Sequence, residues 1–280
     1  MTQSILLISG TSSGIGLTSA VAAARAGFTV VATMRDLGRS GALRAAASTA
    51  GVTLDLQPLD VTDPASIAAC VSYVESTYGR LDALLNNAGA GHLGTIELES
   101  VEAVRAVMEV NFFGVVALTK AFLPLLRASS GRVVSVSSVG GVVGQPFNEA
   151  YCAAKFAVEG FMESLTPVAA TVGVRVSVIE PGAVTTEFVA NVGGQRSVDG
   201  TPYEGALNAY LERTAAAFDP ANAQTPEGVA DVIVGVLTSE NPPARVQTSE
   251  AARRFAGVKL SDLDGAHVQH VTAHWVTGAA

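Results

Sequence analysis

Cysteines and basic residues are scarce in this 280-residue chain. Its two cysteines, Cys70 and Cys152, cannot build a disulfide framework, so we expect reduced thiols. Lysine and arginine number 17 against 25 acidic residues, which gives a net charge of −8. Because no basic stripe is available to meet phosphates, the composition disfavours nucleic-acid binding.

Long apolar runs and targeting signals are also lacking. No charge-free apolar run reaches the roughly 18 residues that predict a transmembrane helix. The first residues, MTQSILLISG, lack a basic region and lead directly into a predicted strand, unlike a signal peptide. We therefore expect a soluble, cytoplasmic protein with no membrane partner. Hydrophobic residues make up 49% of the chain and charged residues only 15%, which favours a large core over disorder.

Short apolar runs alternate with helical patterns along the chain, and this alternation predicts a parallel sheet. The predicted strands span residues 4–9, 28–33, 52–58, 81–85, 132–137, 174–179 and 244–248. The expected fold is α/β, with one domain (residues 1–280) and a doubly wound, mostly parallel seven-stranded sheet that carries helices on both faces. Residues 183–224 are a predicted substrate lid, and residues 249–280 form a C-terminal segment of undefined structure.

A glycine-rich turn follows the first predicted strand and opens a helical segment. It reads G-T-S-S-G-I-G and holds Gly10, Gly14 and Gly16. Strand, glycine turn and helix in this order offer backbone N–H groups and a helix N-terminus to a pyrophosphate. We therefore predict a nucleotide site here, which also includes Ser12, Ser13 and Ile15.

The second predicted strand ends in M-R-D. Proteins that prefer NAD usually place an acidic residue at the end of this strand to bind the ribose 2′-hydroxyl. Here Arg35 precedes the first acidic residue, Asp36. A guanidinium suits a 2′-phosphate, so the sequence favours NADP(H), with NAD(H) still possible.

Three other strand ends or helices carry candidate polar residues. Asp60 follows the third predicted strand, and N-N-A-G at 86–89 follows the fourth. Open α/β sheets bind ligands at such carboxyl ends, although plain turns would look similar. Asn111 lies inside a helical pattern where its propensity is unfavourable, which indicates a functional position.

The candidate catalytic residues lie in residues 138–155, which end in Y-C-A-A-K. Tyr151 and Lys155 are spaced i, i+4, so on a helix they share one face. An ammonium near a phenol lowers its pKa and makes it usable in acid–base chemistry. Ser138 lies upstream of a glycine-rich stretch that allows its hydroxyl to approach Tyr151. Taken alone, Y-x-x-x-K also fits an ordinary helix surface.

Three histidines near the end of the sequence, His267, His270 and His274, raise the question of a metal site. No acidic or cysteine ligand accompanies them in the pattern of a metal centre. We therefore expect no metal.

Together these motifs resemble the short-chain dehydrogenase/reductase family over about residues 4–190. The family's T-G-x-x-x-G-x-G appears as S-G-T-S-S-G-I-G, with Ser9 in place of threonine, and Ala154 replaces a serine. We expect activity to survive both changes. A-T-M-R-D and the segment before Tyr151 are similar to an NADP-preferring subset of 17-beta-hydroxysteroid and retinol dehydrogenase-like members. The remaining matching motifs are Asp60-Val61, N-N-A-G with Asn87, Ala88 and Gly89, and P-G-x-V-x-T with Pro181, Gly182, Val184 and Thr186.

The resemblance implies a Rossmann fold and hydride transfer between NADP(H) and a small-molecule alcohol, ketone or aldehyde. It implies that Tyr151 is the acid and base, that Ser138 binds the substrate oxygen, and that Lys155 tunes the tyrosine and binds the nicotinamide ribose. Asn111 would anchor a water that relays protons from Lys155. Relatives commonly form homodimers or homotetramers.

By position, four residues are candidates to line the pocket of a lipophilic substrate: His92, Gln145, Phe147 and Phe188. Ordinary packing or a surface position would explain them equally well.

Two other functions share parts of this pattern. A non-catalytic NADP(H)-sensing regulator could keep the fold, but all four reacting groups are present here. A sugar-nucleotide epimerase or dehydratase shares the tyrosine, the lysine and the glycine turn. The longer glycine spacing, G-x-x-x-G-x-G, and the modest length after the catalytic helix argue against it.

Overall fold

The computed structural model describes residues 3–186, 200–262 and 267. Phe188, His270 and His274 lie outside these residues. The strands are β1 (Ile5–Ser9), β2 (Thr29–Met34), β3 (Asp55–Pro58), β4 (Ala83–Asn86), β5 (Arg132–Val136), β6 (Arg175–Glu180) and β7 (Arg245–Gln247). The helices are α1 (Gly14–Arg25), α2 (Gly41–Ala50), α3 (Pro64–Tyr78), α4 (Val101–Met108), α5 (Gly114–Ser129), α6 (Glu149–Ala170), α7 (Glu204–Ala217), α8 (Pro226–Thr238) and α9 (Glu250–Leu260).

The seven strands form one sheet in the order β3-β2-β1-β4-β5-β6-β7, and every pair is parallel. This confirms the doubly wound α/β fold and places each predicted strand within three residues of its observed limits. The chain reverses its direction of winding between β1 and β4. Loops from the carboxyl ends of these two strands therefore part and leave a crevice, the usual ligand position in such sheets.

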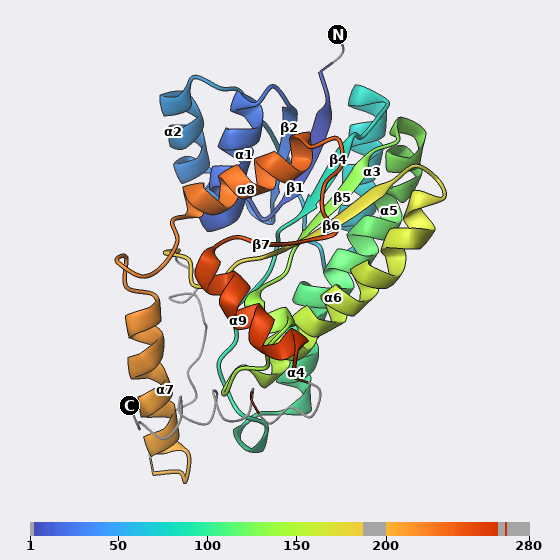
Figure 1. Ribbon diagram of the computed structural model, residues 1–280. Coiled ribbons are helices and arrows are strands. Elements are labelled where there is room, and N and C mark those ends of the chain that lie inside the picture. Colours follow the sequence, from blue (N-terminus) through green and yellow to red (C-terminus); the bar gives the residue numbers. More distant parts are fainter. Residues whose placement is uncertain (1–2, 187–199, 263–266, 268–280) are drawn as a thin grey trace.

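Helices cover both faces of the sheet (Figure 1), and a hydrophobic core lies between the helices and the sheet on each face. Along β1, Ile5 and Leu7 point into the core with α3, α5 and α6, whereas Leu6 and Ile8 point into the core with α1 and α8. This alternation follows from the two-residue period of a strand. Both faces of the central strands β1 and β4 are buried, which explains why these strands read as continuous apolar runs.

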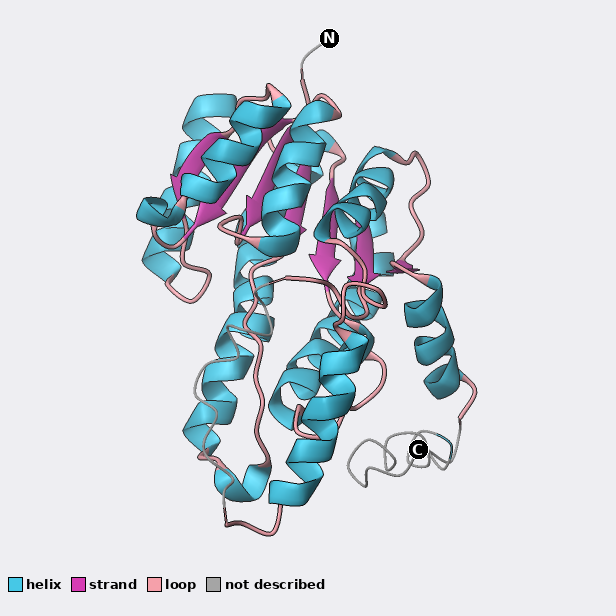
Figure 2. Cartoon of the chain, turned by 90° about the vertical axis from the view of Figure 1, so that its left-hand side faces the viewer, coloured by secondary structure: helices cyan, strands magenta, loops and turns pink. Residues whose placement is uncertain are grey.

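Two helices, α7 and α9, lie at the carboxyl ends of the strands and extend the molecule beyond the sheet (Figure 2). Helix α7 packs through Leu207 and Tyr210 against Phe147. Helix α9 packs through Ala256 against Val142 and Val143. The sequence predicted residues 183–224 as a lid and left 249–280 undefined, and neither prediction anticipated these two helices.

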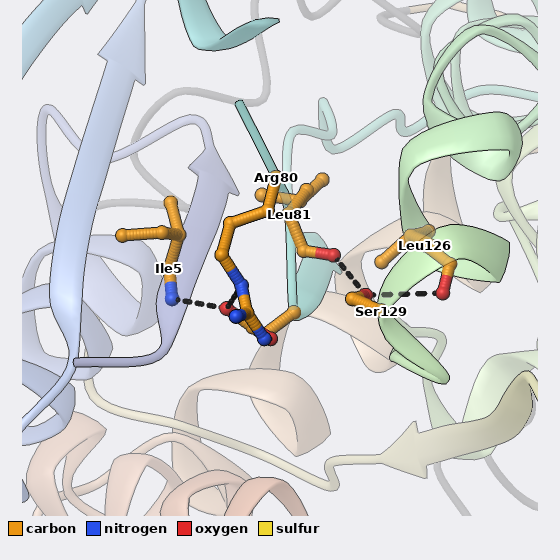
Figure 3. Close-up of polar contacts among 6 residues, drawn as sticks. Ile5, Arg80, Leu81, Leu126 and Ser129 are labelled. Carbon is orange, nitrogen blue, oxygen red and sulfur yellow. Dashed lines mark hydrogen bonds and ion pairs between the residues drawn. The ribbon is translucent and has the colours of Figure 1, made fainter. Parts of the chain in front are cut away.

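The opposite ends of the strands are fixed by a separate polar network (Figure 3). The Ile5 N–H, first in β1, donates to Asp82 Oδ2 at 2.7 Å, and the same carboxylate is paired with Arg80. On the neighbouring side, Ser129 Oγ donates to the carbonyls of Leu81 and Leu126. These bonds tie the start of β1 to the start of β4, so the spacing of the two central strands is set far from the crevice.

The predicted helix over residues 101–128 is continuous but not regular. A π-helical turn, Glu109–Phe113, joins α4 to α5, and Asn111 lies at its middle. By length and composition alone, Val101–Ser129 is the one helix among the described residues that is long and apolar enough to cross a membrane. Leu118, Phe122 and Leu126 of this helix are buried in the core against the sheet.

Candidate active site

A cleft of about 1300 Å³ opens at the carboxyl ends of the strands. It contains every residue predicted from the sequence to bind the cofactor, together with Ser138, His92 and Gln145. These residues are Gly10, Ser12, Ser13, Gly14, Ile15, Gly16, Arg35, Asp60, Val61, Asn87, Ala88, Gly89, Tyr151, Lys155, Pro181, Gly182, Val184 and Thr186. The structure therefore brings together residues that are up to 176 positions apart in the sequence.

The glycine turn approaches its neighbours too closely for any side chain. Gly10 has φ +74°, and a Cβ there would lie 2.8 Å from the Ala88 Cα. A Cβ on Gly16 would lie 2.2 Å from the Gly10 carbonyl oxygen and 2.4 Å from Asn87 Nδ2. Glycine is thus required by close packing of the loop after β1 against the loop after β4, and the bare backbone is left facing the cleft.

Side-chain bonds hold these two loops together. Ser9 Oγ accepts from the N–H groups of Asn87 (3.1 Å) and Ala88 (3.0 Å). Asn87 Nδ2 donates in return to the carbonyls of Ser9 and Gly10, both at 2.9 Å. The hydroxyl that the family motif supplies with threonine is therefore used in full by Ser9. The other substituted position, Ala154, is fully buried beside Val107, where a methyl group fits.

The N-terminus of α1 faces the cleft through Ser13, Gly14 and Ile15. Ser13 is the N-cap residue but makes no side-chain capping bond, and the first turn of the helix carries no acidic residue. The N–H groups of this turn and the positive end of the helix dipole suit a phosphate. The cradle of glycine backbone and helix N-terminus thus fits the pyrophosphate of a dinucleotide.

Two arginines line the far end of the cleft. Arg35 follows β2, as predicted, and Arg39 comes one short helical turn later. The Asp36 carboxylate is turned away, because it accepts from the Gly38 N–H at 2.8 Å and caps that turn. Asp36 is absent from the cleft wall, so the end of β2 presents positive charge to a ligand.

Asp60, also at this end, is held on its own loop. Its Oδ1 accepts from the Thr62 N–H at 2.9 Å and from the Thr62 hydroxyl at 2.7 Å. The Thr62 N–H lowers the pKa of Asp60, and the positive charge of Arg35 acts in the same direction, while burial opposes them. The carboxylate is therefore ionised and fixed at the edge of the cleft.

Ser138 and Tyr151 meet at the inner end of the cleft. Ser138 follows β5 and its Oγ accepts from the Gly140 N–H at 3.0 Å, which fixes the side chain at the start of a short helical turn. Tyr151, in the first turn of α6, is hydrogen-bonded to Ser138. Burial raises the pKa of Tyr151, and the bond to Ser138 partly offsets that rise.

Lys155 lies one turn further along α6 and is only 4% exposed. Its Nζ donates to the Val136 carbonyl at 2.9 Å and lies 5.8 Å from the centre of the Tyr151 ring. Burial lowers the pKa of Lys155 to about 8, against the opposing effect of the Glu159 carboxylate.

The sequence predicted that Lys155 lowers the pKa of Tyr151, and the structure does not show this. The ammonium is directed to a backbone carbonyl, and its Nζ lies 5.8 Å from the centre of the tyrosine ring. The shift of Tyr151 is upward because desolvation of the phenolate outweighs the Ser138 hydrogen bond.

Asn111 lies behind the cleft wall and is fully buried. Its Oδ1 accepts from the Ala90 N–H at 3.1 Å, and its Nδ2 donates to the carbonyls of Ala90 (3.0 Å) and Val107 (3.1 Å). Both amide hydrogens are thus committed to backbone. The family resemblance implies that this residue anchors a water. Only Oδ1 can still accept a hydrogen bond from such a water.

The predicted substrate residues are divided by the structure. His92 and Gln145 line the cleft. His92 Nε2 lies 2.6 Å from Glu99 Oε1, and both side chains are largely buried. Phe147 does not line the cleft: it is buried with φ +57° and packs on the Tyr210 ring at 5.8 Å between centroids. The sequence pattern could not reveal the contact between Phe147 and Tyr210 of α7, which keeps the Phe147 side chain in the core.

Several cleft residues were not predicted from the sequence. Helix α7 contributes Tyr210, Leu211 and Arg213, and α9 contributes Phe255. Asn148 Nδ2 donates to the Tyr210 hydroxyl at 2.7 Å, which joins α7 to the start of α6. Only Arg39 had a sequence signal, since it follows Arg35 by one helical turn; the others come from segments without a recognisable motif.

Of the three histidines considered for a metal site, only His267 lies within the described residues. Among the residues that the structure describes, no three His, Cys, Asp or Glu side chains gather as metal ligands would.

Comparison with known proteins gives a consistent result. The short chain dehydrogenase family profile matches residues 4–197. Retinol dehydrogenase 8 of Bos taurus is 42% identical over 271 residues, which cover 93% of this chain and 86% of that protein. The 17-beta-hydroxysteroid dehydrogenase type 1 of Homo sapiens is 41% identical over 285 residues (98% and 85%). The crystal structure of a single-residue variant of actinorhodin polyketide ketoreductase with NADPH superimposes with a TM-score of 0.75 at 28% identity, covering 88% of this chain and 95% of that one.

Proposed function

This chain belongs to the short-chain dehydrogenase family and is an oxidoreductase acting on CH–OH groups; we propose that it uses NADP(H), with Tyr151 as its acid and base. The observation that carries the proposal is the hydrogen-bonded pair Ser138–Tyr151, with Lys155 one turn away. These groups share a cleft with a bare glycine backbone.

The preference for NADP(H) rests on the charge at the end of β2. Arg35 and Arg39 line the cleft there, whereas Asp36 is committed to its own turn. A 2′-phosphate would find two guanidinium groups, and no carboxylate at the end of β2 would accept a ribose 2′-hydroxyl. A related ketoreductase structure contains NADPH, which supports the same choice.

The bound nicotinamide would supply or accept the hydride. In the reducing direction, the Tyr151 hydroxyl would donate its proton to the substrate oxygen. Ser138 would donate a hydrogen bond to that oxygen and stabilise the negative charge that develops on it. Because burial raises the pKa of Tyr151, the phenol holds its proton at neutral pH and is ready to act as an acid.

The substrate end of the cleft combines apolar and polar walls. Leu93, Leu211 and Phe255 are apolar, while the His92–Glu99 pair and Gln145 provide polar contacts. We propose a lipophilic alcohol, ketone or aldehyde. Two relatives with more than 40% identity carry the names of retinol and hydroxysteroid dehydrogenases, which supports this class.

We also propose a homodimer or homotetramer. Phe113 and Phe156 are 48% and 39% exposed, and large aromatic side chains at the surface favour contact with another chain. Analytical ultracentrifugation would measure the assembly, and a monomer at micromolar concentration would contradict this part of the proposal.

The proposed activity is tested by following NADPH oxidation at 340 nm with aldehydes, steroids, retinoids and keto esters. We expect turnover with at least one lipophilic carbonyl compound. Tight NADPH binding without turnover on the whole panel would favour the regulator instead. Turnover that needs a sugar nucleotide would favour the epimerase or dehydratase.

A further inference from the structure

Three residues of α6 form a row along one side of the helix that faces the end of β5. Tyr151, Lys155 and Glu159 are spaced four residues apart and therefore lie one above the other. Each meets one of three consecutive residues in the strand end: Tyr151 meets Ser138, Lys155 meets the Val136 carbonyl, and Glu159 meets Ser137. The first two members carry the proposed chemistry, and the third has no role yet.

Glu159 is a buried carboxylate, only 6% exposed. A charge at this depth requires compensation, and cations lie on two sides. Arg245 Nε of β7 is 3.4 Å from Glu159 Oε2. Lys155, 4% exposed, lies one turn away on the same side of α6, and the two charges interact.

The surroundings of Glu159 include one further buried acid and one exposed acid. Glu180, at the end of β6, is fully buried and lies 2.8 Å from Arg245 Nε, and it also accepts from Gln247 Nε2 at 3.0 Å. Glu163 of α6 is 3.2 Å from Arg245 Nη2, but its side chain is 74% exposed. Arg245 is therefore shared by three acids, of which only Glu159 is also one turn from Lys155.

The electrostatic effect on Lys155 has a defined sign. Burial lowers the pKa of Lys155 to about 8, and the Glu159 carboxylate is the group that opposes this. Burial raises the pKa of Glu159 to about 7, so the carboxylate is ionised over the range in which Lys155 titrates. Replacing it with a neutral group would leave burial unopposed, and Lys155 would lose its proton at a lower pH.

We propose that Glu159 is a positioning residue that keeps Lys155 protonated under the cleft and so sets the upper pH limit for NADPH binding and turnover. This inference rests on the proposed function, because it requires that Lys155 bind the nicotinamide ribose. Glu159 itself does not touch the cleft wall and acts only through the lysine.

The experiment is a titration of NADPH binding, by fluorescence, from pH 6 to pH 10 on the purified protein. Wild type should lose affinity as Lys155 deprotonates. In Glu159→Gln the midpoint of this loss should move down by about one pH unit, which weakens binding at pH 8 about fivefold. Glu163→Gln removes an acid from the same arginine and should leave the midpoint unchanged. Glu159→Asp keeps the negative charge, so its midpoint should lie close to that of wild type.

A second variant covers the case in which Glu159→Gln does not fold. Arg245 lowers the pKa of Glu159, so Arg245→Gln should raise that pKa further, reduce the negative charge beside Lys155 and move the midpoint in the same direction. Equal midpoints in wild type, Glu159→Gln and Arg245→Gln overturn the inference, as does a uniform loss of affinity at every pH. A wild type that binds no NADPH at any pH overturns the proposed function and this inference together, whereas an unshifted midpoint leaves the proposed function standing.

Discussion

Asn111 is hydrogen-bonded to Ala90 through both ends of its amide group. Its Oδ1 accepts from the Ala90 N–H, and its Nδ2 donates to the Ala90 carbonyl. The π-helical turn places the side chain directly behind the loop that follows β4, and a Cβ on Gly89 would lie 2.9 Å from Asn111 Oδ1. This loop lines the cleft, so a residue that does not reach the cleft surface still determines the position of one wall.

Asn111→Ala should therefore lower both stability and cofactor affinity. Removal of the side chain leaves two backbone partners in Ala90 and one in Val107 without their bonds. The expected loss in the free energy of unfolding is about 1–3 kcal/mol. NADPH affinity should fall because the loop after β4 is released. Denaturant unfolding and NADPH titration measure the two effects, and unchanged affinity would show that Asn111 acts only in proton transfer or folding.

Tyr151→Phe should abolish turnover while NADPH still binds. The substitution keeps the ring but removes the hydroxyl placed to exchange a proton with a substrate oxygen beside Ser138. We expect kcat to fall by at least about 10³, within the range for loss of a general acid. Tyr73→Phe, on α3 far from the cleft, is the matched control and should keep full activity. Residual turnover above a tenth of wild type would contradict the assignment.

Arg35→Ala and Arg39→Ala should each weaken NADPH binding about tenfold to a hundredfold, the range for loss of a charged hydrogen bond to phosphate. NADH binding should change by less than about twofold, because NADH lacks the 2′-phosphate. Arg105→Ala, an exposed arginine on α4, controls for the loss of net positive charge. Equal losses of affinity for NADPH and NADH would show that neither arginine binds the 2′-phosphate.

Gly16→Ala should destabilise the fold and block cofactor binding. The added methyl group meets the Gly10 carbonyl oxygen and Asn87 Nδ2 at distances that force the two loops apart. The expected cost is about 1–3 kcal/mol, typical of overpacking. Gly235→Ala on α8, where nothing lies within 4 Å of the new Cβ, should instead stabilise by about 0.5–1 kcal/mol. Thermal unfolding with and without NADPH compares the two variants in stability and in cofactor binding. Equal melting temperatures for Gly16→Ala and Gly235→Ala would contradict the packing argument.

Stability should fall between about pH 4.5 and pH 7 because of Glu159. Its pKa rises from 4.5 to about 7 on folding, so the folded state binds a proton that the unfolded state has already released. Because the pKa is raised on folding, protonated Glu159 adds its full contribution to the free energy of unfolding below pH 4.5. That contribution is lost as the pH rises through 7. Glu180, also raised by burial, acts in the same direction.

The share of Glu159 in this loss is about 3 kcal/mol. Urea unfolding of wild type at pH 5.0 and pH 7.5 measures the total. Glu159→Gln should show a smaller difference between the two pH values, and Glu163→Gln the wild-type difference. The prediction fails if Glu159→Gln loses as much stability as wild type.

The sequence was most informative where a local pattern determines local structure. Apolar runs between turn signals predicted the central strands, the alternation of strand and helix patterns extended the prediction to β3 and β7, and the glycine turn and Tyr151–Lys155 spacing predicted the cleft. Position in the sequence gave no information on contacts between distant segments. The burial of Phe147 depends on Tyr210, and the compensation of Glu159 depends on Arg245. Sequence spacing also cannot show which acceptor the Lys155 ammonium meets, and in the structure it is directed to the Val136 carbonyl.

The central place of β1 has a consequence for biosynthesis. It pairs with β2 along one edge and with β4 along the other, with Leu6 opposite Ala83. A chain emerging from the ribosome can join β1 to β2 early but must make all of α2, β3 and α3 before β4 arrives. Until then an apolar strand keeps one row of backbone groups unpaired, which invites aggregation. Chaperone binding while residues 35–82 are being made should therefore improve the yield of folded protein, and slow translation over the same residues should lower it, each more than the same intervention near α9.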